Sequence, residues 1–216
     1  MPSRLEKARK DPNSMKARIL ASARKIFGEY GYNDTTTRMI AGDVGIDIST
    51  LYYHWGEKQD LYEAVLMEIS EEIQKELSAV EKKVSGQSLA TRLELAIDMM
   101  SDYLFSHPEV SNLILFGYFN KTRHGVTLDI SMSQYISNIA FAMGLSKNRE
   151  TVSTKVKARI LAVWNTVFNF ISGENFFRPL LDTDREEYIR VVKETLKFIL
   201  VPAFTAEKGS KVQRHR

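Results

Sequence analysis

The chain has 216 residues, 44% of them hydrophobic, which is enough for one large or two small domains with a substantial apolar core. It contains no cysteine, which excludes disulfide bonds and thiol chemistry, and its four histidines are scattered, which argues against a zinc site. The formal net charge is only +3, so an interpretation as a nucleic-acid-binding protein depends on where the charges lie.

No apolar run reaches the ~18–20 residues that cross a bilayer, and no signal peptide opens the chain. We therefore expect a cytoplasmic protein without a membrane partner. We also predict no metal and no cofactor.

The first 16 residues carry five basic side chains against two acidic ones and show no apolar periodicity. Together with Pro2 and Pro12, this pattern predicts a flexible basic arm. Such an arm either contacts phosphates or a minor groove of DNA, or is only a solvated tail. Residues 205–216 form a second basic tail, which we interpret as a disordered end.

A first long helix is expected from a cap at Ser14 to Tyr30, where Gly31 ends it. Residues 35–66 then indicate two short helices around a tight turn, followed by the start of a longer helix. Thr36 or Thr37 can cap the first short helix, because a threonine hydroxyl accepts a hydrogen bond from an unpaired N–H.

Gly45 follows that helix at the point where the chain needs positive φ. Asp47 is the expected cap of the second short helix, in which Ile48, Leu51 and Trp55 recur at helical spacing and face inward. The outward side chains are hydroxyls, an aromatic ring and an imidazole, without an acid: Ser49, Thr50, Tyr53 and His54. Such groups can donate to phosphates and base edges, and the second helix of a helix-turn-helix enters the major groove.

These residues are part of a longer series of motifs: Gly31-Tyr32, Thr36-Thr37-Arg38, Ile40-Ala41, Gly45-Ile46, Thr50-Leu51-Tyr52-Tyr53-His54-Trp55 and Lys58-x-x-Leu61. Over roughly residues 15–66 the series resembles the N-terminal domain of the tetracycline-repressor (TetR/AcrR) family of transcriptional regulators. The resemblance implies an all-α protein. Its parts would be a three-helix N-terminal helix-turn-helix domain and a larger C-terminal helical domain for ligand binding and dimerisation.

By this resemblance, Thr37 contacts phosphate and Arg38 is placed to contact a base, although Arg38 could instead be only a solvated side chain. Tyr52 matches a tyrosine that contacts the DNA backbone, or packs against the first helix, or does both. His54 is interpreted as a neutral phosphate donor and not as a catalytic base. The predicted DNA-binding residues are Thr37, Arg38, Ser49, Thr50, Tyr52, Tyr53, His54 and Lys58.

Two positions depart from the family pattern. Ser49 stands where many members have glycine or proline, and Trp55 replaces the more common phenylalanine. Neither change threatens the fold, but both could alter the operator sequence that is recognised.

A long helix is predicted over residues 57–84, and in the family this helix links the DNA-binding and ligand-binding parts. We place the functional boundary near residue 60. The predicted domains are therefore a DNA-binding domain with the basic arm over 1–60, a ligand-binding and dimerisation domain over 61–204, and the basic tail over 205–216.

Further helices are expected at about 88–106, 108–121, 125–144, 151–173 and 183–204. They are rich in methionine and aromatic residues, which either fill a helical core or line a cavity for a bulky apolar or aromatic effector. The candidate pocket residues are Met99, Met100, Tyr103, Phe116, Phe119, Met132, Tyr135, Trp164, Asn165 and Phe168.

Asn165 and Asn169 lie four residues apart in an apolar run and share one helix face. They could bind ligand, pair across a dimer interface or hold water. The family's last two helices usually form a four-helix bundle with a second subunit, which gives candidate interface residues Val191, Leu196, Ile199 and Leu200. Trp164 and Phe168 would also suit that interface, and the sequence does not separate core from interface.

The expected function is that of a dimeric repressor that binds a near-palindromic double-stranded DNA operator and is released by a small-molecule effector. Activation or corepression is not excluded by the sequence. One alternative is a helical adaptor that binds protein. The other is an enzyme, for which His107, His124 and the pair Asp98 and Asp102 are weak candidates, and we predict that the chain is not one.

Overall fold

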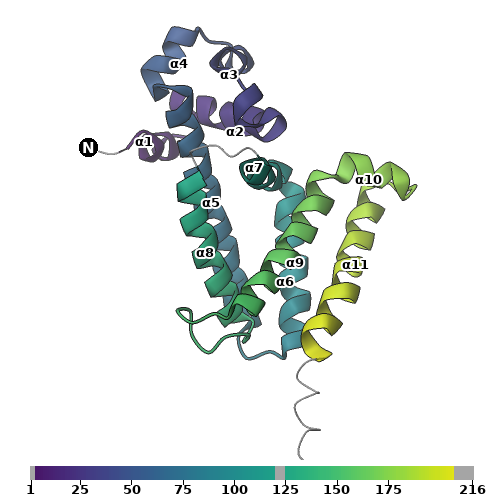
Figure 1. The fold of residues 1–216 in the computed structure, drawn as a ribbon. Coiled ribbons are helices and arrows are strands. Elements are labelled where there is room, and N and C mark those ends of the chain that lie inside the picture. Colours follow the sequence, from purple (N-terminus) through teal and green to yellow (C-terminus); the bar gives the residue numbers. More distant parts are fainter. Residues whose placement is uncertain (1–2, 120–124, 207–216) are drawn as a thin grey trace, which may run out of the picture. The chain divides into compact units, whose positions relative to one another are not determined.

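The computed structural model describes residues 3–119 and 125–206, without the side chains of 119 and 125–131. All regular structure in these ranges is α-helical, which confirms the predicted all-α class (Figure 1). None of the described helices is long and apolar enough to cross a membrane. The helices are α1 Arg4–Lys10, α2 Met15–Asp34, α3 Thr37–Val44, α4 Ile48–Trp55, α5 Lys58–Val84, α6 Leu89–Ser106, α7 Pro108–Phe119, α8 Gly125–Ala142, α9 Thr154–Ser172, α10 Glu174–Leu180 and α11 Arg185–Thr205.

Contacts between residues divide the chain into two compact units. Unit 1 comprises residues 1–72 and 108–128, and unit 2 comprises residues 73–107 and 129–216. Helix α5 contributes its first part to unit 1 and its last part to unit 2. The division by function at residue 60 stays a prediction, and most of the C-terminal basic tail lies outside the described residues.

Unit 1 is built on α2, which packs against α1, α3, α4 and α7. Ser14 caps α2 by accepting a hydrogen bond from Ala17 N, as the sequence indicates. Gly31 interrupts the helical conformation with φ 72° and ψ 177°, but a further turn continues to Asp34, beyond the predicted end. The Thr35 hydroxyl then donates to Gly31 O over 2.6 Å and closes the corner.

The prediction of a flexible arm is wrong for residues 4–10, because they form helix α1. Ser3 and Glu6 make a reciprocal capping box at its start, and Leu5 and Ala8 are buried. The Ser3-x-x-Glu6 spacing was a signal in the sequence, but two apolar residues are too few to show periodicity. The N-terminal charges are therefore part of unit 1.

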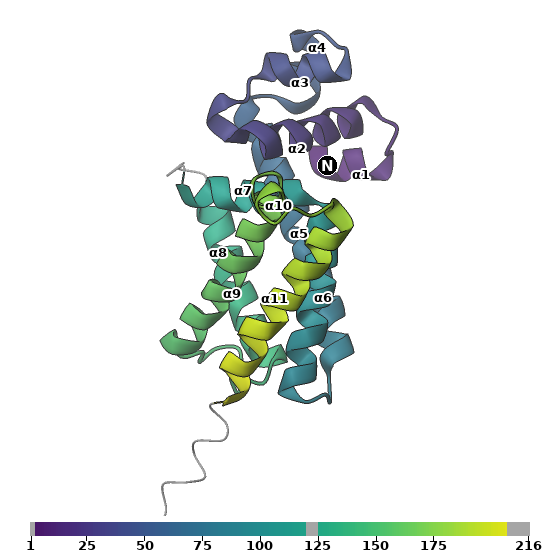
Figure 2. The same ribbon diagram turned by 90° about the vertical axis from the view of Figure 1, so that its right-hand side faces the viewer.

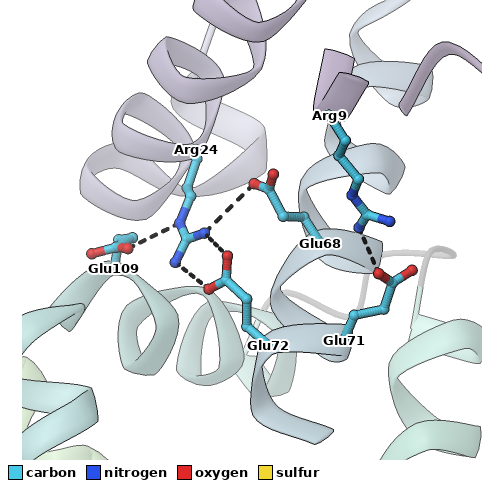
Figure 3. A network of polar contacts seen from close by, with 6 residues as sticks. All are labelled: Arg9, Arg24, Glu68, Glu71, Glu72 and Glu109. Carbon is cyan, nitrogen blue, oxygen red and sulfur yellow. Dashed lines mark hydrogen bonds and ion pairs between the residues drawn. The ribbon is translucent and has the colours of Figure 1, made fainter. Parts of the chain in front are cut away.

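One arginine connects three helices of unit 1 (Figure 3). Arg24 of α2 is only 14% exposed and binds both carboxylate oxygens of Glu72 on α5, at 2.6 and 2.8 Å. Its Nε donates to Glu109 of α7 over 2.9 Å, and Glu68 lies 3.5 Å away. Beside this network, Arg9 of α1 pairs with Glu71 at 2.7 Å. Burial alone lowers the pKa of Arg24, but the hydrogen bond and charges of these acids outweigh it and raise that pKa.

Unit 2 is held together chiefly by apolar side chains. Helices α6 and α11 pack against each other and against α9, and Figure 2 shows α11 beside both. One buried cluster contains Val80, Val84, Leu93, Met143 and Phe204, and a second contains Ile136, Ala140, Val152 and Ile160. Helix α10, which begins directly after Gly173, was not predicted.

Candidate nucleic-acid interface

The turn between α3 and α4 has the geometry that the sequence predicts. Of the two candidate caps, Thr36 is the one used, and its hydroxyl accepts from Met39 N over 3.2 Å. Gly45 takes the left-handed conformation with φ 75°, and Ile46 N donates back to Ala41 O over 2.9 Å. Asp47 is the N-cap of α4 but makes no side-chain hydrogen bond there.

Helix α4 has a buried side and an exposed side. Leu51 and Trp55 are fully buried, and Ile48 is half-buried. On the other side Tyr53 is 81% exposed and Ser49 is exposed, while Thr50 and His54 are half-buried. The faces are therefore arranged as the spacing predicts, with polar and aromatic groups directed away from the core.

The start of α3 lies next to this exposed side. Arg38 is exposed, and the hydroxyl of Thr37 lies 3.5 Å from that of Tyr52 on α4. Tyr52 therefore contacts α3, while its ring stays 41% exposed, and its predicted roles stay predictions. A ligand that covers this surface would meet side chains from both helices.

The carboxyl end of α4 is held by a side chain of α1 and by the main chain of α2. Arg4 donates to Trp55 O and lies 3.4 Å from the Asp60 carboxylate. The Trp55 indole N–H in turn donates to Lys16 O over 3.0 Å. These contacts of Arg4 and Lys16 were not predicted, because both residues fall in the predicted flexible arm.

His54 has a basic neighbour. Its Nδ1 lies 3.2 Å from Lys16 Nζ. Burial, and then the charge of Lys16, lower the pKa of His54. Burial, and then the charges of Lys7 and Arg4, lower the pKa of Lys16. A neutral imidazole on this surface agrees with the predicted role of a neutral donor, which stays a prediction.

Lys58 is occupied by contacts within unit 1. Its ammonium donates to Tyr32 O and Thr35 O, both over 2.7 Å, and lies 4.3 Å from the centroid of the Tyr32 ring. Burial lowers its pKa, opposed by the charge of Asp34. The predicted phosphate contact of Lys58 would compete with these bonds at the end of α2, and no structural observation tests it.

The predicted pocket residues are divided between the two units. Phe116 belongs to unit 1, where its ring lies against Gly31. In unit 2, Tyr135, Trp164 and Phe168 form a row of rings with centroid separations of 6.4 and 6.0 Å. Asn165 is exposed and donates to Leu161 O.

The remaining pocket candidates show no common site. Met99 and Met100 pack against the first buried cluster of unit 2, and the Tyr103 ring lies 5.1 Å from that of His107. Met132 is half-buried, and the Phe119 side chain lies outside the described residues. Membership of a pocket therefore stays a prediction.

The dimer candidates differ in burial. Leu196 and Leu200 are buried in unit 2, Val191 is half-buried and Ile199 is 51% exposed. The neighbouring Phe198, which was not selected, is 80% exposed. Asn169 is exposed and donates to Asn165 O.

Of the weak enzymatic candidates, the two acids are engaged in ion pairs, and the His107 ring lies 5.1 Å from that of Tyr103. Asp98 pairs with Lys197 and Asp102 with Lys193, each at 2.7 Å. His124 lies outside the described residues. Within the described ranges, no group of three or more metal-ligating side chains could hold an ion.

Comparison with known proteins agrees with this geometry. Residues 19–65 match the family model described as bacterial regulatory proteins, tetR family. The chain is 47% identical over 47 residues to the HTH-type transcriptional dual regulator CecR of Shigella flexneri, covering 22% of this chain and 21% of that one. It is 43% identical over 49 residues to the HTH-type negative transcriptional regulator IcaR of Staphylococcus aureus, covering 23% and 26%.

The fold of most of the chain resembles that of the transcriptional regulator FadR from Bacillus subtilis, solved in complex with stearoyl-CoA. The TM-score is 0.55 at 13% identity, over 85% of this chain and 96% of that one. The chain spans between a fifth and a half of the length of the curated relatives it matches. It is thus an all-α protein with an N-terminal helix-turn-helix. Its residues 19–65 match the tetR family of bacterial regulatory proteins.

Proposed function

We propose that the chain is a repressor that binds a near-palindromic DNA operator as a homodimer and is released by a bulky apolar or aromatic effector. The exposed side of α4 is the observation that carries this proposal. It presents Tyr53 at 81% exposure beside Ser49 and Thr50, on a helix held by the buried Trp55. A rigid helix with exposed hydroxyl and ring donors is what base and phosphate recognition requires.

The charges beside α4 support a polyanionic partner. Arg38 is exposed at the start of α3, and Lys16 lies against His54. Arg18 of α2 is exposed and donates to Val44 O at the end of α3. Neutralising phosphates with such groups makes binding salt-dependent.

Exposed apolar side chains support the dimer. Phe198 and Ile199 of α11 project from the described surface of unit 2, and Leu161 of α9 is also exposed. Covering them with the same surface of a second copy would give a two-fold interface. Two-fold symmetry places two α4 helices about one DNA turn apart, which explains why a near-palindromic operator is proposed.

The effector class is supported by the row of rings Tyr135, Trp164 and Phe168, which would suit an apolar or aromatic ligand. The structurally similar FadR was solved with stearoyl-CoA, a ligand with a long apolar chain. Release follows if the effector binds better to a conformation that binds DNA worse. DNA must then weaken effector binding by the same factor.

The test is binding of the purified chain to DNA from beside its own gene, measured across a salt series. Tyr53→Ala should weaken binding by roughly 10–100-fold, as expected for a contact worth about 1–3 kcal/mol. Tyr30→Ala is the matched control, because Tyr30 is an exposed tyrosine of α2. Equal loss of DNA affinity in both variants would refute the assignment of α4 as the DNA-contacting helix. If the chain bound another protein, independently of salt, and did not bind DNA, the alternative of a helical adaptor would be favoured.

A further inference from the structure

Lys16 is attached to α4 through both its main chain and its side chain. Its carbonyl oxygen accepts the Trp55 indole N–H over 3.0 Å, and its ammonium lies 3.2 Å from Nδ1 of the adjacent His54. Trp55 of α4 is fully buried, so the Lys16 main chain is fixed against this helix. The ammonium is therefore held at one nitrogen of the imidazole ring.

This contact determines where the imidazole carries its hydrogen. An ammonium has three donors and no acceptor, so it can bond Nδ1 only when Nδ1 has a free lone pair. A neutral imidazole whose Nδ1 accepts must carry its hydrogen on Nε2. The geometry thus selects one of the two neutral tautomers.

The surroundings also disfavour the imidazolium. Among the described residues, Lys16 of α2 is the charged group that shifts the pKa of His54, and it acts in the same direction as burial. Lys7 and Arg4 of α1 are basic and act on Lys16, while the neighbouring ring on α4 is Tyr53, at 5.1 Å between centroids. No acid of α3 or α4 contributes to the shift, so the ring stays neutral near neutral pH.

We propose that Lys16 is a positioning residue that holds His54 in the Nε2–H tautomer, so that the recognition helix presents a neutral, directed N–H donor to an acceptor on DNA. That acceptor is a phosphate oxygen or a guanine O6 or N7, which share the chemistry that an N–H donor requires. The DNA part of this inference rests on the proposed function. The tautomer itself does not.

A neutral His54 with its hydrogen fixed on Nε2 would favour binding to the operator over other DNA. A charged imidazolium would donate from both nitrogens and be attracted to every phosphate, which strengthens binding to any sequence. A neutral ring with one fixed donor rewards only a correctly placed acceptor.

The tautomer can be measured on the full chain without DNA, from long-range proton–nitrogen NMR correlations of the histidine ring. The His54 signals are assigned by their loss in His54→Gln. We expect Nε2 protonated and Nδ1 unprotonated in the wild type and in Lys16→Arg, which keeps the donor. In Lys16→Met the preference should weaken, whereas the control Lys10→Met, at an exposed lysine of α1, should leave it intact.

A hydrogen on Nδ1 in the wild type would overturn the proposal, as would an unchanged ring signal in Lys16→Met. The substitution leaves the Lys16 carbonyl in place, so the bond from Trp55 and the fold should survive. Retained near-ultraviolet circular dichroism of Lys16→Met checks this. If that variant unfolds, the comparison of Lys16→Arg with the wild type still decides, because a lost tautomer preference there would contradict the proposal.

Operator binding provides a second readout. Removing Lys16 removes a charge that opposes protonation, so the pKa of His54 should rise in Lys16→Met. Its DNA affinity should then increase as pH falls from about 8 to about 6, by up to about tenfold per pH unit for one linked proton. Wild-type affinity should change less over this range.

The ratio of operator to random DNA binding should fall in Lys16→Met and be restored in Lys16→Arg. Operators that carry 7-deazaguanine test guanine N7 as the acceptor, because they lack that atom and keep O6. Absence of any operator binding would refute the proposed function and leave the NMR result standing. Operator binding with an identical pH profile in Lys16→Met would refute the role of Lys16.

Discussion

The two units expose different kinds of large side chain. Among the described residues of unit 1, the exposed large hydrophobic side chains are Tyr30, Tyr52, Tyr53, Met67 and Tyr118. In unit 2 they are Phe141, Leu161, Phe176, Leu180, Leu181, Phe198 and Ile199. A tyrosine has an apolar ring and a hydroxyl, so it suits a partner with hydrogen-bonding groups, whereas phenylalanine, leucine and isoleucine gain only by being covered. The contrast fits a polar partner for unit 1 and an apolar one for unit 2.

One arginine of each unit illustrates a difference in ion pairing. Arg24 of unit 1 is 14% exposed and binds acids from two other helices. Arg190 of unit 2 is 55% exposed and pairs with Glu187 and Glu194 of its own helix. Partners that come from other helices fix tertiary geometry, while pairs within one exposed helix contribute little. Unit 2 also has ion pairs between helices, Lys193–Asp102 and Lys197–Asp98, but these lysines are more exposed than Arg24.

The largest effect should come from Arg24→Met. Removing the guanidinium leaves Glu68, Glu72 and Glu109 close together without compensation, which should cost about 3–5 kcal/mol of unfolding free energy. Urea unfolding followed by circular dichroism measures this loss. The control Arg190→Met should leave the urea midpoint unchanged, and equal midpoints in the two variants would contradict the contrast between the units.

Two glycines with positive φ extend the comparison to the backbone. Gly31 of unit 1 has φ 72° and ψ 177°, a region nearly restricted to glycine, and an added Cβ would lie 3.3 Å from the Phe116 ring. Gly31→Ala should therefore cost up to about 3 kcal/mol. At Gly144 of unit 2 the nearest atom is the end of the flexible Arg92 side chain, so Gly144→Ala should cost less, roughly 1–2 kcal/mol.

Gly42 provides the unstrained control for these thermal or urea measurements. It lies inside α3 and an added Cβ would meet nothing within 4 Å. Gly42→Ala should stabilise the fold by roughly 0.5–1 kcal/mol, because alanine favours helix. If Gly31→Ala were as stable as Gly42→Ala, the positive φ at Gly31 would not be a requirement of the native fold.

Much of the helix-turn-helix could be predicted because its signals are local. The Thr36 cap, the turn at Gly45 and the spacing of Leu51 and Trp55 all depend on residues within a few positions of one another. The contact from Arg4 to Trp55 O joins residues 51 apart, and no local pattern indicates it. The same is true of Arg24 and its partners on α5 and α7.

The assignment of C-terminal residues to the core or to a dimer interface was limited for a different reason. Leu196 is buried and Ile199 is half exposed, although both belong to the same apolar pattern on α11. Helical spacing groups such residues but does not decide which side of the helix the core covers. Helix α10 escaped prediction because it is only seven residues long and contains Pro179 near its end.

Two aromatic side chains of similar exposure allow the functional contrast to be tested directly. Phe198→Ser should weaken the proposed dimer by roughly tenfold or more, since covering a phenylalanine is worth about 1.5–3 kcal/mol. Tyr53→Ser should leave the dimer intact and weaken operator binding. Sedimentation equilibrium measures the first effect and DNA titration at concentrations that keep the protein dimeric measures the second. Loss of dimer in Tyr53→Ser, or none in Phe198→Ser, would break the assignment of partners to units.

The smallest expected effect is the pH dependence of folding stability, and its sign differs between one glutamate of unit 1 and one of unit 2. Burial raises the pKa of Glu68 in unit 1, and the charge of Arg24 only partly offsets this. Protonation of Glu68 therefore favours the folded state. This contribution is fully present below the pKa of the unfolded chain and is lost as pH rises through the folded pKa. In unit 2 the hydrogen bond from Arg190 lowers the pKa of Glu187, so its contribution is present above the unfolded pKa and is lost on acidification.

Glu68→Gln should consequently be more stable than the wild type at neutral pH, with an advantage that shrinks as pH falls towards about 4. Glu187→Gln should be slightly less stable at neutral pH, and its disadvantage should also shrink on acidification. Urea midpoints of the three proteins across this pH range measure both differences. If Glu68→Gln were destabilising at neutral pH, the attraction of Arg24 would outweigh the burial of that carboxylate, and the network would favour a charged Glu68.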